Sequence, residues 1–181
     1  MGKNMNKEEK TLKENLIYDG RIIKVYNDEV LCPNGNKSHR EYIKHNGGVC
    51  ILAIKDGYIY FEKQFRYPYH TEVLELPAGK LELNEDPLEA AKRELKEEIG
   101  FTSKNMEYIG YFYPSVGYTN EIIRLYFSSD NELGDTHPDE DELIEVVKLT
   151  VKEAYDLLDK GEIADAKTVI LLSKLKERLL K

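Results

Sequence analysis

Three carboxylates crowd the end of one predicted helix, in the stretch "RELKEEIG" that ends at Gly100. A glycine typically ends a helix, and the helix dipole leaves partial negative charge there. The chain nevertheless places Glu97 and Glu98 in this last turn, with Glu94 one turn before Glu98. Two carboxylates about 5 Å apart repel by roughly 1 kcal/mol in water and by about 3 kcal/mol at an effective dielectric constant near 20. Stability alone therefore does not explain the cluster.

A hard divalent cation such as Mg²⁺ or Mn²⁺ would turn this repulsion into attraction, because these ions prefer carboxylate oxygens and retained waters. The helix that carries the cluster is predicted to run from Pro87 to Ile99, with Asp86 as its N-cap. Its apolar residues form a core-facing stripe, which comprises Leu88, Ala91, Leu95 and Ile99. The alternative is a solvated helix face on which Arg93 and Lys96 soften the repulsion.

The residues upstream favour the metal site. The stretch "GKLELNEDPLEAAKRELKEEIGF" matches the Nudix box at every defined position, and these positions are Gly79, Glu85, Arg93, Glu94, Leu95, Glu97, Glu98, Gly100 and Phe101. At average composition, the chance of meeting all these constraints is below about one in a million. The chain therefore resembles a Nudix hydrolase, a family that cleaves a nucleoside diphosphate linked to another moiety.

This resemblance implies a loop–helix–loop in which carboxylates hold divalent metal, with Mg²⁺ as the expected ion and Mn²⁺ as an alternative. The implied metal ligands are the side chains of Glu94, Glu97 and Glu98 and the backbone carbonyl of Ala78. Gly79, Glu85 and Arg93 resemble the residues that brace the loop against the helix. Glu98 and Glu97 are also expected to act in catalysis.

The resemblance extends to the ADP-ribose pyrophosphatase subfamily, whose members split ADP-ribose into AMP and ribose 5-phosphate. It rests on "REYIKHNGGVCIL", "EKQFRYP", "EVLELPAGKLE" and "GEIADAKTVILL". It implies that Arg66 contacts the diphosphate, and that Arg40 and Glu41 reach the nucleoside end of the substrate from the partner subunit of a homodimer. Two alternatives stay open. Arg66 could be a surface strand residue, and Arg40 with Glu41 could form an ordinary cross-strand ion pair.

The stretch "YPSVGYTNEIIRLYF" places Glu121 on a loop before a strand, where similar enzymes hold a glutamate near the attacking water. An exposed residue at a strand start is the alternative. Gly117 is expected to contact the substrate. The subfamily usually has Ser-Pro-Gly where this chain has Ser115-Val116-Gly117, so GDP-mannose, another nucleoside diphosphate sugar or an oxidised nucleotide stays open as the substrate. The proton acceptor also stays open among Glu97, Glu98, Glu121 and acidic-loop residues such as Glu140 and Glu142.

Strand and helix patterns mix without a regular βαβ alternation. This favours an α+β or α/β protein with a sandwich around a mixed sheet. The resemblance implies the Nudix fold, an α/β/α sandwich around such a sheet. The resemblance also implies that an N-terminal antiparallel β segment, residues 1–45, crosses over and builds the dimer. Residues 46–181 are expected to form the hydrolase domain with its box at 79–101. Two further helices are predicted after Thr150, which has a capping box with Glu153, and after Asp165. The run 130–142 is acidic and is predicted to be a loop.

Bulk composition limits the partners. The 181-residue chain has a net charge of −8, which argues against non-specific binding to nucleic acid or to anionic membrane. It has two cysteines and no apolar run of the roughly 20 residues needed to cross a bilayer, so a cytoplasmic protein is expected. The alternative from another class is a non-catalytic Nudix module that senses a nucleotide, against which the intact box argues.

Overall fold

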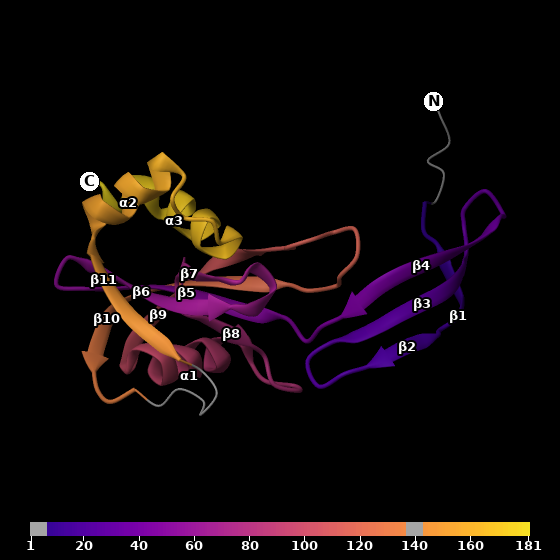
Figure 1. Ribbon diagram of the computed structural model, residues 1–181, viewed down its shortest axis with the longest axis horizontal. Helices are drawn as coiled ribbons and strands as arrows, with labels where there is room; N and C mark the ends of the chain where they lie inside the picture. Colours follow the sequence, from indigo (N-terminus) through magenta and orange to yellow (C-terminus); the bar gives the residue numbers. More distant parts are fainter. Residues whose placement is uncertain (1–6, 137–142) are drawn as a thin grey trace. The chain divides into compact units, whose positions relative to one another are not determined.

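The computed structural model describes residues 7–136 and 143–181. The chain divides into two compact units (Figure 1). We call the part up to His45, together with residues 115–121, the N-terminal unit. The C-terminal unit comprises Asn46–Pro114 and Ile122–Lys181.

The N-terminal unit is an antiparallel sheet centred on one long strand. Its strands are β1 (Lys10–Lys13), β2 (Leu16–Asp19), β3 (Lys24–Leu31) and β4 (Lys37–Lys44). β4 pairs along all of β3, and β1 and β2 pair with successive parts of it. In the β3–β4 turn Gly35 has φ of 85°, which glycine adopts without strain. The hairpin predicted at Asn34-Gly35 is therefore confirmed.

The C-terminal unit is built on a seven-stranded mixed sheet with the order β11-β6-β5-β10-β9. β10 is parallel to β5, whereas β7 pairs antiparallel with β6 and β8 with β5. The strands are β5 (Gly48–Lys55), β6 (Tyr58–Arg66), β7 (Thr71–Glu75), β8 (Ala78–Lys80), β9 (Phe101–Phe112), β10 (Ile123–Leu133) and β11 (Ile144–Thr150). A short 3-10 helix, Tyr67–Tyr69, precedes β7. The loop prediction for 130–142 is wrong at its start, because β10 continues to Leu133.

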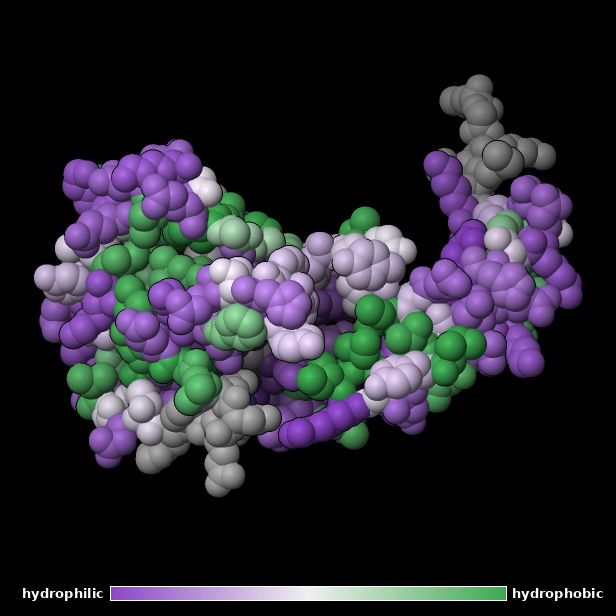
Figure 2. All heavy atoms as spheres, viewed as in Figure 1, coloured by the Kyte–Doolittle hydropathy of each residue, from purple (hydrophilic) through white to green (hydrophobic). Residues whose placement is uncertain are grey.

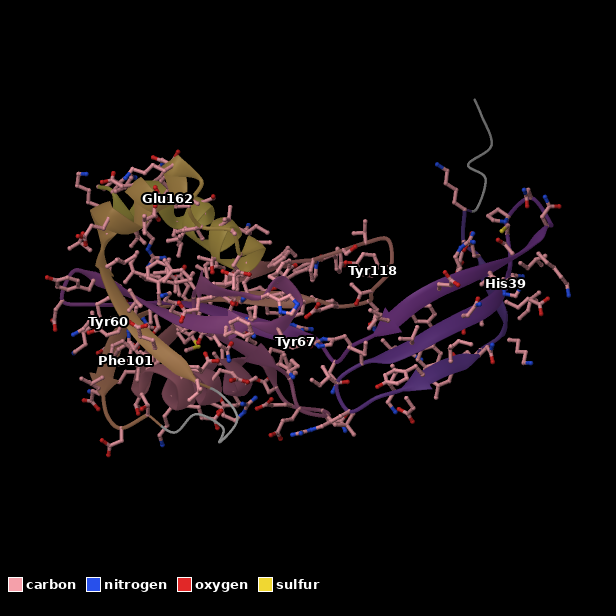
Figure 3. The ribbon with its side chains drawn as sticks, viewed as in Figure 1. His39, Tyr60, Tyr67, Phe101, Tyr118 and Glu162 are labelled. Carbon is pink, nitrogen blue, oxygen red and sulfur yellow. The ribbon has the colours of Figure 1, made fainter. Side chains whose placement is uncertain are left out.

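Helices cover both faces of this sheet (Figure 1). Successive residues of a strand point to opposite faces, so Val49 and Ile51 pack with α1 (Pro87–Ile99), whereas Cys50 and Leu52 pack with α2 (Val151–Lys160) and α3 (Ala166–Leu179). Tyr60 and Phe101, labelled in Figure 3, pack on the α1 side with ring centroids 4.5 Å apart. The predicted α/β/α sandwich around a mixed sheet is confirmed.

Local chemistry sets the ends of the helices. At the start of α1, Asp86 accepts hydrogen bonds from the amides of Leu88 and Glu89 at 2.9 and 3.2 Å. Gly100 ends α1 with φ of 78°, in the left-handed region. Thr150 and Glu153 form the predicted capping box of α2. Among the described helices, none is long and apolar enough to span a membrane.

Candidate metal centre and active site

Arg93 ties the loop that precedes α1 to the helix itself. Its guanidinium binds both carboxylate oxygens of Glu85, with Nε–Oε1 and Nη2–Oε2 distances of 2.9 and 3.0 Å. It also donates to the carbonyl of Lys80 at 3.2 Å. Glu85 in turn accepts a hydrogen bond from the amide of Glu82 at 2.9 Å. Hydrogen bonding to Arg93 lowers the pKa of Glu85, so the carboxylate stays ionised at neutral pH.

The same guanidinium also reaches the acidic cluster. Arg93 Nη1 lies 2.8 Å from Glu94 Oε1 and 3.0 Å from Glu97 Oε2. The pKa of Arg93 is raised, chiefly by its hydrogen bond to Glu85 and then by Glu94. Arg93 therefore reduces the repulsion between the carboxylates, as expected for a solvated helix face. The side chain of Glu94, however, is only 12% exposed, which a fully solvated face would not show.

Glu98 differs from its two neighbours because it is buried, with 6% of its surface exposed. The amide of Ala78 donates to its Oε2 at 3.0 Å, and its carboxyl lies near the Glu62 carboxyl on β6. Burial raises the pKa of Glu98, and the charge of Glu62 raises it further. Burial also raises the pKa of Glu62, and the negative charge of Glu75 adds to this effect. The sequence analysis did not identify Glu62.

Gly79 leaves room for the Glu94 carboxylate. A Cβ built on Gly79 would lie 2.0 Å from both the carboxyl carbon and Oε1 of Glu94. That separation is far below any real contact, so only glycine fits while Glu94 keeps this position. β8 thus presents Ala78 to Glu98 and Gly79 to Glu94, which places two box carboxylates along one short strand.

Arg66 belongs to a buried ionic network that the sequence analysis missed. Its Nε and Nη2 bind the two oxygens of Glu75 at 2.5 and 2.8 Å, and Glu75 also forms an ion pair with Lys167. Lys167 pairs in turn with Asp165 at 3.1 Å. Burial raises the pKa of the Glu75 carboxyl, but Arg66 and Lys167 outweigh burial and lower it overall. Arg66 is therefore held in one orientation by two hydrogen bonds and is not a loose surface side chain.

In the N-terminal unit, Arg40 and Glu41 are adjacent on β4, where successive side chains point to opposite faces. Arg40 pairs with Glu9, with an Nε–Oε2 distance of 2.8 Å, and donates to the carbonyl of His39 at 2.7 Å. Asn27 on β3 is the register partner of Glu41. The alternative of an ion pair between Arg40 and Glu41 is therefore wrong.

The loop 115–121 belongs to this unit as well. The amide of Ile43 donates to the carbonyl of Tyr118, labelled in Figure 3, at 2.8 Å. Glu121 Oε1 lies 3.4 Å from His45 Nδ1, so Glu121 is not simply an exposed residue at a strand start. Nothing lies within 4 Å of a Cβ built on Gly117, so the space beside this glycine is open. Glu140 and Glu142 lie outside the described residues.

Comparison with known proteins assigns the family, because residues 44–172 match the NUDIX domain. The chain belongs to the Nudix family. It is 41% identical over 177 residues to the ADP-ribose pyrophosphatase of Bacillus subtilis, which covers 95% of this chain and 96% of that protein. It is 40% identical to a methanol dehydrogenase activator of Bacillus methanolicus, over 93% of this chain and 92% of that protein.

Two further similar proteins are less closely matched in sequence. A GDP-mannose pyrophosphatase of Yersinia enterocolitica is 33% identical, over 72% of this chain and 73% of that protein. The crystal structure of an ADP compounds hydrolase superposes with a TM-score of 0.87 at 23% identity, covering 99% of this chain and 97% of that one. At that identity the likeness establishes the fold alone.

The Nudix residues of this chain fit a hard divalent cation. Within residues 7–136 and 143–181, no three His, Cys, Asp or Glu side chains are drawn together closely enough to hold an ion as they stand. In this arrangement Glu94 and Glu97 both pair with the guanidinium of Arg93. Glu94 against Gly79 and Glu98 against Ala78 nevertheless offer the carboxylate oxygens that Mg²⁺ and Mn²⁺ prefer.

Proposed function

We propose that this Nudix protein hydrolyses the diphosphate bond of ADP-ribose to give AMP and ribose 5-phosphate, with Mg²⁺ or Mn²⁺ as cofactor. The observation that carries the proposal is the carboxylate pair of Glu94 and Glu98, seated against Gly79 and Ala78 in a box that is complete. The 41% identity to an ADP-ribose pyrophosphatase over nearly the whole chain supports this substrate.

In this proposal the cation is held by Glu94, Glu97 and Glu98 and by the carbonyl of Ala78. When bound, a divalent cation supplies charge neutralisation of the diphosphate and a more acidic water. Arg66 stabilises negative charge on the phosphoryl oxygens. Glu75 fixes its guanidinium with hydrogen bonds of 2.5 and 2.8 Å, so little side-chain freedom is lost when substrate binds.

The remaining residues of the proposed site accept a proton or bind the substrate outside its diphosphate. Glu97 or Glu121 accepts the proton of the attacking water, because a carboxylate within reach of that water can act as a general base. Arg40 and Glu41 bind the nucleoside end from the partner subunit, and Gly117, which has open space beside it, approaches the substrate. We place this chemistry in the cytoplasm, and the free thiols of Cys32 and Cys50 support that location.

Substrate preference tests the proposal, because Ser115-Val116-Gly117 departs from the usual Ser-Pro-Gly. A relative that is 33% identical is a GDP-mannose pyrophosphatase, so GDP-mannose is the substrate to compare. We expect kcat/KM for ADP-ribose to exceed that for GDP-mannose at least about tenfold, which corresponds to roughly 1.4 kcal/mol of transition-state discrimination. The measurement is initial rates on a panel of nucleoside diphosphate sugars at fixed Mg²⁺. A preference of tenfold or more for GDP-mannose would refute ADP-ribose as the substrate and keep the diphosphate chemistry.

We also infer a homodimer built through the N-terminal unit. This sheet exposes large apolar side chains, namely Leu12, Leu16, Ile17, Tyr18, Ile22 and Ile23. Figure 2 shows hydrophobic side chains gathered over the β2 end of this sheet. Ile17 and Tyr18 are 58% and 57% exposed, and contiguous apolar surface of this kind typically marks an interface.

The homodimer predicts a solution mass of twice the 21.0 kDa of one chain. Ile17→Asp is expected to shift the protein to a monomer at micromolar concentration, because a charge on the apolar surface opposes its burial. Leu180→Asp, at a residue 50% exposed beyond α3, serves as the matched control and should leave the mass unchanged. Sedimentation velocity measures both, and a monomeric wild-type protein would refute the dimer.

A second candidate function is regulation of another enzyme, which the 40% identity to a methanol dehydrogenase activator favours. In its non-catalytic form, the chain would bind a nucleotide and leave it intact. Turnover decides between the two candidates. Hydrolysis of any member of the panel supports the enzyme, whereas nucleotide binding without hydrolysis supports the regulator.

A further inference from the structure

A buried carboxylate outside the Nudix box lies beside the predicted metal centre. Glu62 on β6 is 0% exposed. Across the described ranges, no N–H or alcohol group donates a hydrogen bond to either of its carboxylate oxygens. A buried polar group without a partner costs free energy, and an unpaired charge costs more. Glu62 is therefore expected to lower the stability of the folded protein unless a ligand binds its carboxylate.

The surroundings of Glu62 indicate what is missing. Its register partner across β6 and β7 is Glu75, so two acidic residues lie directly opposite each other. Glu75 is compensated by Arg66 and Lys167. On the other side, Glu62 faces the buried carboxyl of Glu98, which cannot compensate it. Among the described residues, cationic side chains therefore pair with Glu75 but with neither Glu62 nor Glu98.

We propose that Glu62 is a further metal-binding carboxylate of this centre, which supplies an anionic oxygen to the divalent cation held by Glu98. The inference rests on the proposed function, because it needs the cation that the box residues would hold. It adds a residue from β6 to ligands that otherwise come from α1 and the strand before it. A cation between Glu62 and Glu98 would pair both buried charges at once, which no side chain of the described ranges does.

The test is direct metal binding to the purified protein, measured by calorimetry with Mn²⁺ and Mg²⁺ alone. Glu62→Gln keeps the shape of the side chain and removes its charge. We expect it to raise the dissociation constant for metal at least about tenfold. Glu62→Asp, which keeps the charge on a shorter side chain, should fall between Glu62→Gln and wild type. The control Glu132→Gln alters an exposed residue of β10 that pairs with Lys104, and it should bind metal as wild type does.

Thermal melting separates this role from a purely structural one. In EDTA, Glu62→Gln should melt at the wild-type temperature or about 2–4 °C above it, because a buried carboxyl without a hydrogen-bond partner has been removed. In saturating metal, it should gain less stability than wild type. A structural role would instead lower the melting temperature in both conditions, and that result would overturn the inference.

The outcomes also separate this inference from the proposed function. Wild-type binding with equal affinity in Glu62→Gln overturns the role of Glu62 and leaves the hydrolase intact. Failure of wild-type protein to bind either cation overturns both. A tenfold loss confined to the Glu62 variants supports the inference.

Discussion

Glu98→Gln is expected to lower kcat for diphosphate hydrolysis on the order of 10³-fold while the protein stays folded. The glutamine oxygen can still accept the hydrogen bond that the amide of Ala78 donates at 3.0 Å. The negative charge is lost, however, and with it the attraction for the cation. A cation that neutralises a transition state contributes several kcal/mol, and each 1.36 kcal/mol is a factor of ten in rate.

The measurement is kcat at saturating substrate, with Mg²⁺ and then Mn²⁺ raised until the rate no longer changes. Glu89→Gln is the matched control, because Glu89 lies on the same helix and pairs with Lys92 at 2.7 Å away from the buried carboxyls. Far-ultraviolet circular dichroism checks the fold of both variants. Turnover of Glu98→Gln equal to wild type at matched metal would refute the role of this carboxylate.

Arg93→Met is expected to lower the free energy of unfolding by about 2–4 kcal/mol in EDTA. The variant removes the hydrogen bonds to Glu85 at 2.9 and 3.0 Å and the contacts of the guanidinium with Glu94 and Glu97. Breaking a fully buried ion pair costs about 3–5 kcal/mol, and Arg93 falls somewhat below that range because its side chain is 28% exposed. Activity should fall as well, since the loop is no longer fixed to α1.

The stability of Arg93→Met should also depend on divalent cation. Saturating Mg²⁺ should restore part of the lost stability, because it replaces the charge of Arg93 beside Glu94. Urea denaturation in EDTA and in Mg²⁺ measures both effects. Lys92→Met on the exposed side of α1 is the control, and it should change little because exposed ion pairs contribute little to stability. A loss below about 1 kcal/mol for Arg93→Met in EDTA would contradict the proposed bracing.

Helix α1 shows what could be predicted from the sequence. Its start at Pro87 follows from the capping side chain of Asp86, and its end follows from a glycine in the left-handed conformation. Both signals act within one turn of the chain, so no tertiary information is needed. The same holds for α2, whose capping box joins Thr150 to Glu153. The box residues were recognisable for a similar reason, because their spacing in the sequence is fixed.

Strands at sheet edges were harder to predict. β11 was missed, because Ile144–Thr150 is short and only partly buried, and it ends directly at the cap of a helix. Its existence depends on pairing with β6 along its whole length. The acidic sequence at the end of β10 predicts a loop for a related reason. Asn131 is buried there and forms hydrogen bonds with Ser128 and Ile54, which no local pattern reveals.

The side chains that pair with the site residues could not be predicted from the sequence either. In the sequence, Glu62 resembles a polar residue of a strand with alternating polar and apolar positions. Only the packing of β6 against α1 brings it close to Glu98. Glu75 and Lys167 are far apart in the chain, and the fold brings them together around Arg66. Buried ionic contacts of this kind depend on the register of strands and on helix packing, neither of which a motif encodes.

The most direct test of the account is product analysis after incubation of the protein with ADP-ribose and Mg²⁺, with and without EDTA. The account predicts equal amounts of AMP and ribose 5-phosphate in Mg²⁺, and neither product in EDTA or with Glu98→Gln. Product formation that persists in EDTA, or an intact nucleoside diphosphate sugar panel after prolonged incubation with Mg²⁺ and Mn²⁺, would contradict a metal-dependent diphosphate hydrolase.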